Sequence, residues 1–358
     1  MRKIALFLII SIYAFATEQK LSFIAVGDNL IHTKIIESGY IDTNNTYVFD
    51  DLYANFKDKI SNIDIKIINQ ETILIDDSKE YSGYPNFGSP FEIGLAVKNA
   101  GFNVITHATN HTLDKGEAGI LKSIEFWSKY DDIALLGIYN SQDDSENLTI
   151  IQKNGIKIAL LNYTYGLNGH KTPKNKEYLV DLLSDTDKIK RALKTAKKNA
   201  DFIIVLPHWG VEYTHKPTDE QKKMAKFFAD NGADIIIGTH PHVIEPLEFI
   251  ASDDNRSVPC FYSLGNFISN QDKPVRMLGA MAKFEIKKDN NAAYISHIEA
   301  VPLITHVQTY SKEFSVYFLQ DYPEILEKTH RLKRFFGNEM SVENFKKIWN
   351  EVFVNFQI

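Results

Sequence analysis

The sequence predicts an α/β fold in which helices cover sheets of largely parallel strands. Three observations indicate this fold: short apolar runs alternate with longer helical patterns, the runs are apolar along their whole length, and several of them end in polar clusters. Continuous apolar runs are expected where both faces of a strand are buried. With 358 residues, 44% of them hydrophobic and 24% charged, the composition fits a globular protein of one large or two modest domains.

Each element follows from its local pattern. The predicted strands are Ser22–Val26, Ile65–Asn69, Asn103–Thr106, Ile133–Leu136, Lys157–Asn162, Phe202–Leu206, Ile235–Gly238 and Pro259–Ser263. The segments with apolar residues at helical spacing are Glu92–Ala100, Lys115–Tyr130, Thr186–Ala200 and Thr218–Asn231. Gly232 follows the last of these, as expected at a helix end. Strands therefore alternate with helices from residue 22 to residue 263.

The pattern changes after Asn270. Met281–Ile286 and Ala293–Val301 predict a β-hairpin around Asp289, and the chain is helical and charged from Asp321 onward. We therefore expect residues 21–270 to form the main domain. Residues 271–358 are expected to be an appended β-hairpin and helical tail packed on that domain.

The first 16 residues resemble a secretory signal peptide. Arg2 and Lys3 precede an apolar run from Ile4 to Tyr13, and residues 14–16 form a small-x-small triplet that suits signal peptidase. The alternative is a buried first strand. The signal-peptide interpretation predicts export to the periplasm or to the extracellular face of a bacterial membrane.

Charge and cysteine content exclude some partners and cofactors. The formal charge of −6 argues against a nucleic-acid partner, which usually meets a basic surface. The single cysteine, Cys260, allows no intramolecular disulfide and no cysteine-rich zinc site. Any bound metal must then be held by His, Asp, Glu or Asn side chains.

Polar clusters follow five of the predicted strands or lie just beyond them. In open α/β sheets, ligands bind at the carboxyl ends of the strands. Clusters from distant parts of the chain can therefore converge on one crevice. The five segments are residues 26–32, 68–72, 109–114, 207–212 and 238–242.

These clusters contain the ligand types of a divalent metal site. Carboxylates, imidazoles and an amide oxygen suit Mn, Fe or Zn, and a carboxylate can bridge two cations. Such a set is large enough for two ions about 3.5–4 Å apart, which together activate water and hold an oxyanion. In an extended segment, His240 and His242 point to the same side; in a tight turn, they reach two neighbouring ions. The predicted metal ligands are Asp28, Glu71, Asn110, His208, His240 and His242.

Two further residues are predicted to be catalytic. His111 is positioned to donate a proton to a leaving group, and Asp114 to orient its imidazole. Other polar residues near the clusters are expected to contact substrate or to support the ligands. These are His32, Asn69, His107, Glu212 and Asn266.

Taken together, the motifs resemble a known family. Their order is that of the calcineurin-like metallophosphoesterases, and the finer similarity is to the CapA-type poly-γ-glutamate capsule synthesis proteins. It extends from Leu21 to Ser269. The motifs that carry it are Gly27-Asp28, Asn69-Gln70-Glu71, residues 109–114 with Gly116, residues 208–213, residues 238–243 and residues 262–267.

The resemblance implies a four-layer αββα sandwich with two divalent ions between the sheet ends. By position, Asp28, Glu71 and His242 would hold one ion; Glu71, Asn110, His208 and His240 would hold the other; and His111 would be the acid. The sequence also departs from the phosphoesterase pattern. Glu71 stands where a bridging Asp is usual, and Leu30 replaces the first-motif His, so that His32 is the nearest imidazole.

The resemblance implies a role in poly-γ-glutamate capsule or envelope-polymer synthesis. One hypothesis is a metal-dependent hydrolase or transferase acting on an anionic polymer or small molecule, through a phosphoester or a γ-glutamyl amide. The alternative is a non-catalytic envelope factor that binds or guides an anionic polymer. Membrane-bound capsule synthesis proteins are candidate partners under either hypothesis.

Overall fold

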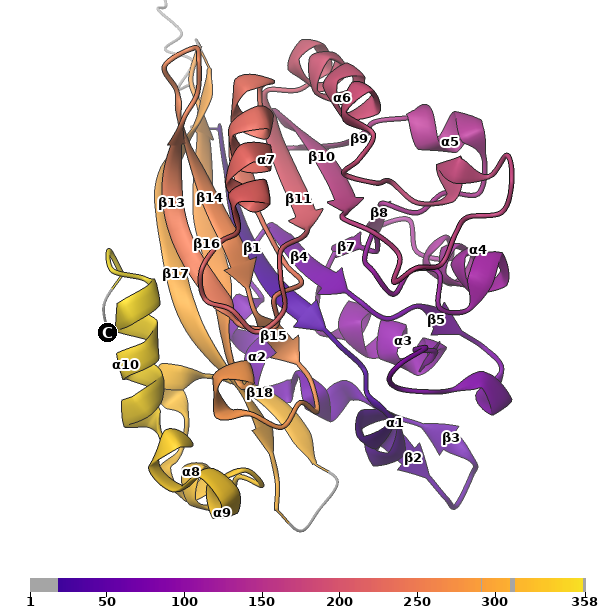
Figure 1. Cartoon of the computed structure of the whole chain (residues 1–358), viewed down its shortest axis with the longest axis vertical. Helices are drawn as coiled ribbons and strands as arrows, with labels where there is room; N and C mark the ends of the chain where they lie inside the picture. The colour runs from indigo at the N-terminus through magenta and orange to yellow at the C-terminus, as the bar shows by residue number, and fades with distance from the viewer. Residues whose placement is uncertain (1–18, 291, 310–312, 357–358) are drawn as a thin grey trace, which may run out of the picture.

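The computed structural model describes residues 19–290, 292–309 and 313–356 (Figure 1). Two β-sheets face each other, and helices cover their outer faces, so the predicted α/β fold in four αββα layers is confirmed. The predicted signal peptide at residues 1–16 lies outside the described residues. Among the described residues, no helix is both long and apolar enough to span a membrane.

The first sheet joins the N-terminal and C-terminal parts of the chain. Its strand order is β18-β17-β16-β1-β4-β7-β8, and β15 pairs with the end of β1. The parallel strands are β1 (Gln19–Asn29), β4 (Ile65–Gln70), β7 (Val104–Thr106), β8 (Ala134–Leu136) and β15 (Asn266–Ile268). The antiparallel strands are β16 (Leu278–Lys288), β17 (Ala293–Val307) and β18 (Phe314–Phe318).

The second sheet has the order β13-β14-β12-β11-β10-β9. Its parallel centre consists of β10 (Ile156–Thr164), β11 (Phe202–His208), β12 (Ile235–Ile237) and β14 (Ser257–Leu264). The edge strands β9 (Thr149–Lys153) and β13 (Ile244–Ala251) are antiparallel to their neighbours. Asp28 of β1 and His242, which follows β12, are in contact, so carboxyl ends of parallel strands from both sheets meet.

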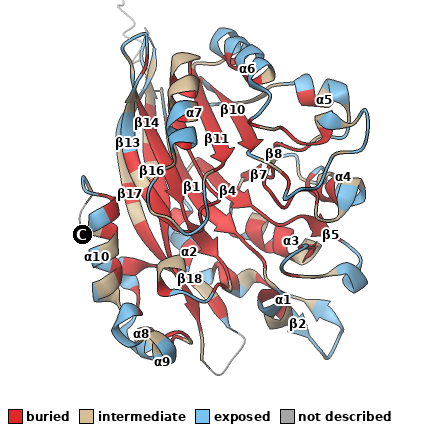
Figure 2. Ribbon diagram, in the orientation of Figure 1, coloured by how far each residue is buried: buried red, intermediate tan, exposed pale blue. Residues whose placement is uncertain are grey.

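Alternating side chains explain why this sheet is buried on both faces. Ile204 and Leu206 of β11 belong to the core between the sheets, whereas Ile203 and Val205 pack outward. The outward residues are covered by α6 (Thr186–Asn199) and α7 (Asp219–Asp230). Figure 2 shows the central strands of both sheets buried and many residues of these helices exposed. Helices α3 (Phe91–Asn99) and α4 (Gly116–Trp127) contribute buried residues to the core of the first sheet.

Shorter elements complete the chain. They are α1 (Thr33–Gly39), β2 (Tyr40–Ile41), β3 (Thr46–Tyr47), α2 (Ala54–Lys57), β5 (Leu74–Ile75), β6 (Ser89–Pro90), α5 (Gln142–Glu146), α8 (Glu324–Thr329), α9 (Lys333–Phe336) and α10 (Val342–Val352). All eight predicted strands and all four predicted helices are present, with ends shifted by a few residues. The sequence did not indicate the edge strands β9 and β13. Partly exposed edge strands tolerate polar residues and proline, as Glu248 and Pro246 of β13 illustrate.

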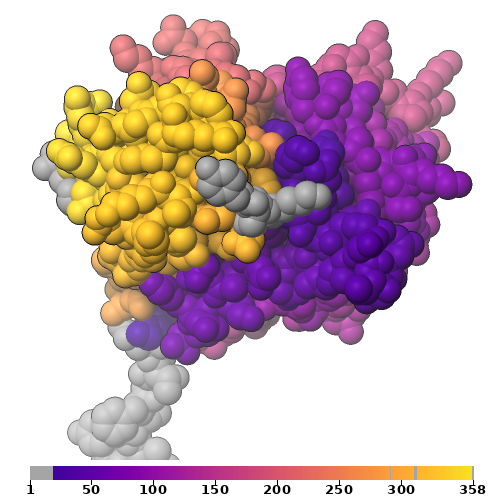
Figure 3. All heavy atoms as spheres, turned by 90° about the horizontal axis from the view of Figure 1, so that it is seen from below, coloured from indigo at the N-terminus to yellow at the C-terminus, as the bar shows by residue number. Residues whose placement is uncertain are grey.

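The predicted C-terminal hairpin is present as β16 and β17, both longer than expected. β16 pairs with β1 from Gln19 to Val26. The hairpin is therefore an integral part of the first sheet, although it follows the main domain in the sequence. The helical tail packs on the sandwich: Trp349 of α10 and Phe353, which follows it, are buried, and Phe353 lies 6.5 Å from Phe261 between ring centroids. Figure 3 shows this tail beside the N-terminal segments. The domain boundary at residue 270 stays a prediction.

Candidate metal centre

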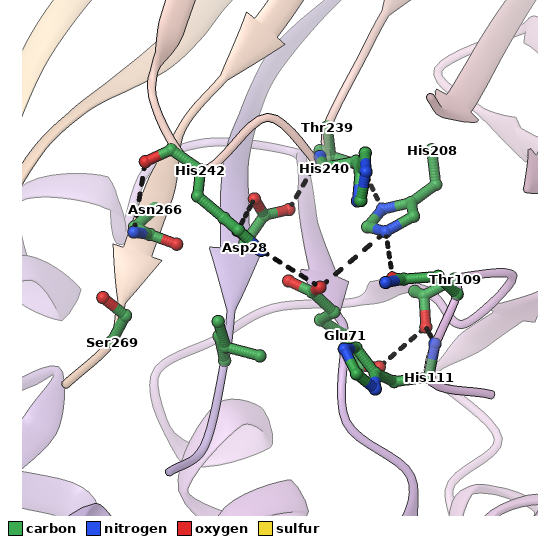
Figure 4. A network of polar contacts seen from close by, with 12 residues as sticks. Asp28, Glu71, Thr109, His111, His208, Thr239, His240, His242, Asn266 and Ser269 are labelled. Atoms are coloured by element: carbon green, nitrogen blue, oxygen red, sulfur yellow. Dashed lines mark hydrogen bonds and ion pairs between the residues drawn. The ribbon is translucent and has the colours of Figure 1, made fainter. Parts of the chain in front are cut away.

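The candidate metal centre lies where parallel strands of both sheets end (Figure 4). Asp28 is near the end of β1, Glu71 follows β4, and His208 is the last residue of β11. His240 and His242 lie in the turn between β12 and β13. All five side chains are buried, so the structure brings four of the five predicted clusters together in the protein interior. The fifth cluster, at Asn110, joins them through His208.

Asp28 is held in place by its neighbours. Its Oδ1 accepts hydrogen bonds from Asn69 Nδ2 at 2.8 Å and from the backbone N–H of His240 at 3.3 Å. Its Oδ2 lies 3.0 Å from His242 Nδ1. The preceding Gly27 permits this arrangement, because a Cβ there would lie 1.8 Å from the carbonyl oxygen of Gly265. Asp28 therefore has a fixed orientation beside His242.

Glu71 is the central side chain of the site. Both of its carboxylate oxygens are buried and have no hydrogen-bond partner among the described residues. Its Oε1 lies 3.8 Å from His208 Nε2 and 3.7 Å from His242 Nε2. Burial, and then the nearby carboxylate of Asp28, raise the pKa of Glu71 well above its usual range. A divalent cation would remove this penalty, because it stabilises the carboxylate anion.

His208 has a defined partner on each side. Its Nε2 lies 2.8 Å from Asn110 Oδ1, and its Nδ1 lies 3.0 Å from Thr239 Oγ1. The His240 ring packs 4.8 Å away between centroids, and its Nδ1 is buried without a hydrogen-bond partner in the described chain. Burial lowers the pKa of both His208 and His240 well below the usual value. Neutral imidazole is the form that binds metals.

The His240–His242 segment is a turn and not an extended strand. Both residues have positive φ, at 102° for His240 and 60° for His242, in a region that non-glycine residues rarely adopt. The turn places the His240 ring against His208 and the His242 ring against Asp28. Of the two geometries that the spacing allowed, the backbone has the turn, and the two imidazole rings lie 5.8 Å apart between centroids. Strained backbone of this kind often accompanies function.

The side chains present fit a divalent cation. Glu71, His240 and His242 each offer a ligand atom, and these atoms lie within 4.8 Å of one another. The unpartnered oxygens of Glu71 and Nδ1 of His240 are buried groups that a cation would satisfy. Asp28, Asn110 and His208 border the same point. The number of ions, their identity and the division of ligands between them stay predictions.

His111 lies on the Glu71 side of the centre (Figure 4), and Asp114 contacts it. His111 Nδ1 is 2.7 Å from Asp114 Oδ2, and the same oxygen accepts a hydrogen bond of 2.7 Å from the backbone N–H of Phe87. The Phe87 ring packs edge-on against His111, with 4.6 Å between centroids. Asp114 thus fixes the imidazole and occupies its Nδ1, which leaves Nε2 for proton transfer.

Comparison with known proteins identifies the family. Residues 22–271 match the family described as "Bacterial capsule synthesis protein PGA_cap". The chain belongs to this family. The matched range contains every predicted ligand from Asp28 to His242, together with Asn266. The hairpin and tail after residue 271 lie beyond it.

Two relatives of this PGA_cap protein are CapA proteins from Bacillus species. The chain is 31% identical to "Capsule biosynthesis protein CapA" of Bacillus anthracis over 80% of its own length and 67% of the relative's. It is 34% identical to "PGA biosynthesis protein CapA" of Bacillus subtilis strain 168 over 60% of its own length and 53% of the relative's. The chain therefore spans about half of the Bacillus subtilis protein and two thirds of the Bacillus anthracis protein.

Solved structures with a similar chain path include two enzymes of low sequence identity. The calcineurin-like phosphoesterase YfkN from Bacillus subtilis is 15% identical, with a TM-score of 0.43, and covers 92% of this chain and 100% of its own. The NAD nucleotidase NadN from Haemophilus influenzae is 14% identical, with a TM-score of 0.48, and covers 80% of this chain and 58% of its own.

The supporting residues predicted for this PGA_cap protein lie at different distances from the centre. Asn69 contacts Asp28, and Asn266 Nδ2 donates to the carbonyl oxygen of His242 at 3.2 Å, so both contact predicted ligands. His107 is buried, and neither ring nitrogen has a hydrogen-bond partner in the described chain; burial lowers its pKa to about 3. Glu212 is exposed, and its charge contributes to the raised pKa of Glu71.

His32 borders the centre and does not join the ligands that contact one another. Its Nδ1 lies 3.1 Å from the carbonyl oxygen of Leu30 and 3.3 Å from the backbone nitrogen of Asn270. Its ring packs against Phe87, with 5.4 Å between centroids. Burial lowers its pKa to about 4, with smaller contributions from His242 and His111. Leu30, at the position of the missing motif histidine, is buried.

Four residues that contact the centre were not among the predicted site residues, although Thr239 lies within one of the five polar segments. Tyr165 packs on His240 at 4.6 Å, Asn168 Oδ1 accepts from Asn110 Nδ2 at 3.2 Å, Thr239 contacts His208, and Phe87 contacts His111. Tyr165 and Asn168 follow β10, a central strand of the second sheet. No site residue was predicted at the carboxyl end of this strand. The rule that located the other clusters also applied there. Phe87 comes from a loop, for which no strand end gives a signal.

Glu245 is a buried acid that the centre does not use, and it makes stability depend on pH. Its Oε2 accepts a hydrogen bond of 2.6 Å from Gln221, and burial raises its pKa from the usual 4.5 to about 8. Between these values the folded state keeps a proton that the unfolded chain releases. Stability therefore falls as pH rises through this window.

We expect Glu245→Gln to stabilise the protein by on the order of 2 kcal/mol at about pH 8, with little effect near pH 4. Urea unfolding at both pH values measures this difference, and Glu351→Gln, at an exposed position of α10, is the control. An equal change at both pH values would show that Glu245 does not titrate between them.

Proposed function

We propose that this protein is a metal-dependent hydrolase or transferase that acts on an anionic substrate in the synthesis of capsule or another envelope polymer. The observation that carries the proposal is Glu71, whose two buried carboxylate oxygens lack hydrogen-bond partners and face His208 and His242. A buried carboxylate without partners is costly unless a cation compensates it. A binding surface for a polymer does not require such a group.

The proposed chemistry assigns a task to each side chain. Asp28, Glu71, Asn110, His208, His240 and His242 would hold the ions. Bound divalent cations supply Lewis-acid polarisation and activate water near neutral pH. Asn69 and Thr239 fix the orientation of Asp28 and His208 through the contacts described above. His111, oriented by Asp114, gives a proton to the leaving group from Nε2.

The substrate class is proposed on charge and on the relatives. Two divalent ions offset by Asp28 and Glu71 would leave a positive centre that attracts anions to an acidic protein. A phosphoester and a γ-glutamyl amide both present an electrophilic centre beside an anion. The names of the two Bacillus relatives, for PGA and capsule biosynthesis, support a polymer of this kind. We further propose that the protein acts after export, beside membrane-bound capsule synthesis proteins.

The decisive assay compares the purified protein with its His240→Ala/His242→Ala double variant. We expect turnover of phosphodiesters or of γ-glutamyl oligomers by the parent in Mn or Zn, and a loss of at least 100-fold in the double variant. The same reactions in excess chelator give the metal-free control. Equal turnover in parent and variant would assign the activity to a contaminant.

A non-catalytic role is the second candidate function. It is favoured by Leu30, a buried apolar residue where a metal-binding histidine is usual. His32, the nearest imidazole, has its Nδ1 against backbone atoms of Leu30 and Asn270. If the parent binds metal and the anionic polymer without converting any substrate, the centre serves polymer binding.

A further inference from the structure

Cationic side chains gather where the C-terminal tail meets the segment that follows β15. Arg276 ends the short 3₁₀ helix Pro274–Arg276, and Arg331 lies between α8 and α9. Both arginines come after residue 271, where the match to the PGA_cap family ends. The tail, yellow in Figure 3, lies beside the N-terminal segments. We call Arg276 and Arg331 the arginine pair, and neither is a predicted metal ligand.

Arg331 has a fixed position and hydrogen-bond donors that a ligand can reach. Its Nη1 donates to Asn270 Oδ1 at 2.6 Å, and its backbone N–H donates to the carbonyl oxygen of Val307 at 2.7 Å. Its Nε and Nη2 donate to no residue of the described chain, and neither atom is closed off from solvent. These two nitrogens form one side of the guanidinium group, and together they can donate to two oxygens of the same anion.

No carboxylate pairs with Arg331 within the described ranges. The side chain is partly buried, and its hydrogen bond goes to a neutral amide. Burial, followed by the charge of Arg334, lowers the pKa of Arg331, and Asp272 opposes this by less. A partly desolvated cation without a paired anion costs free energy. A carboxylate or phosphate bound at Nε and Nη2 would remove this cost, because the guanidinium fork matches its oxygens.

Contacts connect Arg331 to the edge of the metal centre. The backbone nitrogen of Asn270, whose side chain accepts from Arg331, lies 3.3 Å from His32 Nδ1. The charges of His242, His111 and Arg331 all contribute to the lowered pKa of His32. Arg331 therefore lies on the side of the centre that His32 borders.

Arg276 approaches the centre from the His242 side. Its Cζ lies 3.6 Å from the ring centroid of Tyr213, whose ring lies 6.0 Å from that of His242 between centroids. Its Nη1 pairs with Asp272 Oδ1 at 3.2 Å. Asp272 also acts on Arg331, so the two arginines share this carboxylate as a neighbour. Asp272 and Tyr213 are exposed, so solvent reaches this side of the centre.

Two further cations make this region positive in an acidic protein. Lys273 Nζ lies 5.1 Å from the ring centroid of Phe336, and Arg334 Cζ lies 4.4 Å from that of Phe335. Neither cation has an ion pair in the part of the chain that the structure describes. Together with the arginine pair, they outnumber Asp272. The local charge therefore favours an anion, although the whole chain carries a formal charge of −6.

We propose that the arginine pair binds an anionic group of the substrate that is distinct from the group converted at the metal centre. Arg331 donates from Nε and Nη2 to a carboxylate or phosphate, and Arg276 adds positive charge beside it. The inference rests on the proposed function and deepens it, because it requires a substrate with at least two anionic groups. A polymer with regularly spaced anions meets this requirement.

The first test is a calorimetric titration of the metal-free full chain, in which no metal competes for the anion. The probes are tri-γ-glutamate and tripolyphosphate, and the one that binds more tightly identifies the ligand as carboxylate or phosphate. We expect saturable binding with a Kd on the order of 1 mM, as for a fragment-sized ligand. Arg331→Gln should weaken binding at least tenfold. Arg331→Lys, which keeps the charge without the planar fork, should weaken it less.

Matched controls separate the arginine pair from the general charge of the protein. Arg191→Gln removes an exposed cation from α6 and should leave the Kd unchanged. Asp272→Asn should tighten binding, because it removes the carboxylate that competes for Arg276. An uncharged amide analogue of tri-γ-glutamate should bind at least tenfold more weakly than the acid. Circular dichroism confirms that each variant is folded. No binding of either probe, or equal binding by the parent and Arg331→Gln, would overturn the inference.

Kinetics of the metal-loaded protein distinguish this inference from the proposed function. For a substrate with a second anionic group, Arg331→Gln should raise KM at least tenfold with a smaller change in kcat. For a substrate that lacks this group, the rise in KM should be much smaller. If the parent converts both substrates and the variant raises both KM values equally, the inference fails and the proposed function stands. Binding that depends on Arg331 without any turnover would support the anion site and contradict the catalytic proposal.

Discussion

Glu71→Gln is expected to lower bound divalent metal from about two ions per chain to less than one. Glu71 is the side chain that faces both His208 and His242, so its removal affects ligands on both sides of the centre. Glutamine keeps the size of the side chain but removes the charge that a bridging ligand supplies. Elemental mass spectrometry of protein equilibrated with Mn or Zn and then desalted measures the change.

Thermal unfolding separates lost metal binding from lost folding. In the parent, a bound ion raises the Tm, and a chelator lowers it again. In Glu71→Gln, we expect the metal-free Tm at neutral pH to be no lower than that of the parent, because the variant removes a buried acid whose raised pKa costs stability there. Added metal should no longer raise it. Glu212→Gln, which removes an exposed carboxylate near the centre, should keep both ions. No metal in the parent would contradict the dinuclear centre.

The fold could be predicted from sequence wherever a strand is buried on both faces. Runs such as Phe202–Leu206 are apolar throughout, since the core between the sheets covers one face and α6 packs on the other. Edge strands do not carry this signal. In β13, Pro246 and Glu248 interrupt the pattern, because one side of an edge strand needs no partner. The pairing of β16 with β1 was equally hidden, because it joins segments far apart in sequence.

The position of the candidate centre could be predicted because parallel strands deliver their ends to one edge of a sheet. That rule located Asp28, Glu71 and His208 without knowledge of their contacts. It could not give the positive φ of His240 and His242, which depends on how the turn fits between Asp28 and His208. Long-range packing of a loop, as for Phe87 on His111, was also beyond a local pattern.

His111→Ala is expected to lower kcat by about 10²- to 10⁴-fold while the metal content stays at the level of the parent. The imidazole contacts Asp114 through Nδ1, and within the described part of the chain it forms no hydrogen bond or ring contact with Glu71, His208 or His242. Its removal therefore takes away a proton donor and leaves the ligands in place. The measurement is the rate of substrate conversion under saturating substrate, beside metal analysis of the same sample.

Asp114→Asn and His297→Ala make this prediction specific. Asp114→Asn keeps the imidazole but weakens its orientation, so it should give a smaller loss of kcat with little change in KM. His297 is exposed on β17, and its replacement should change neither quantity. A substrate with a leaving group that needs no proton should restore much of the rate in His111→Ala. If that substrate is converted no faster by His111→Ala than the ordinary one, His111 does not donate the proton.

The same variants also distinguish catalysis from polymer binding. If neither the parent nor any variant converts a substrate, and polymer binding survives in His111→Ala but fails in His240→Ala, the centre binds the polymer and the catalytic proposal fails.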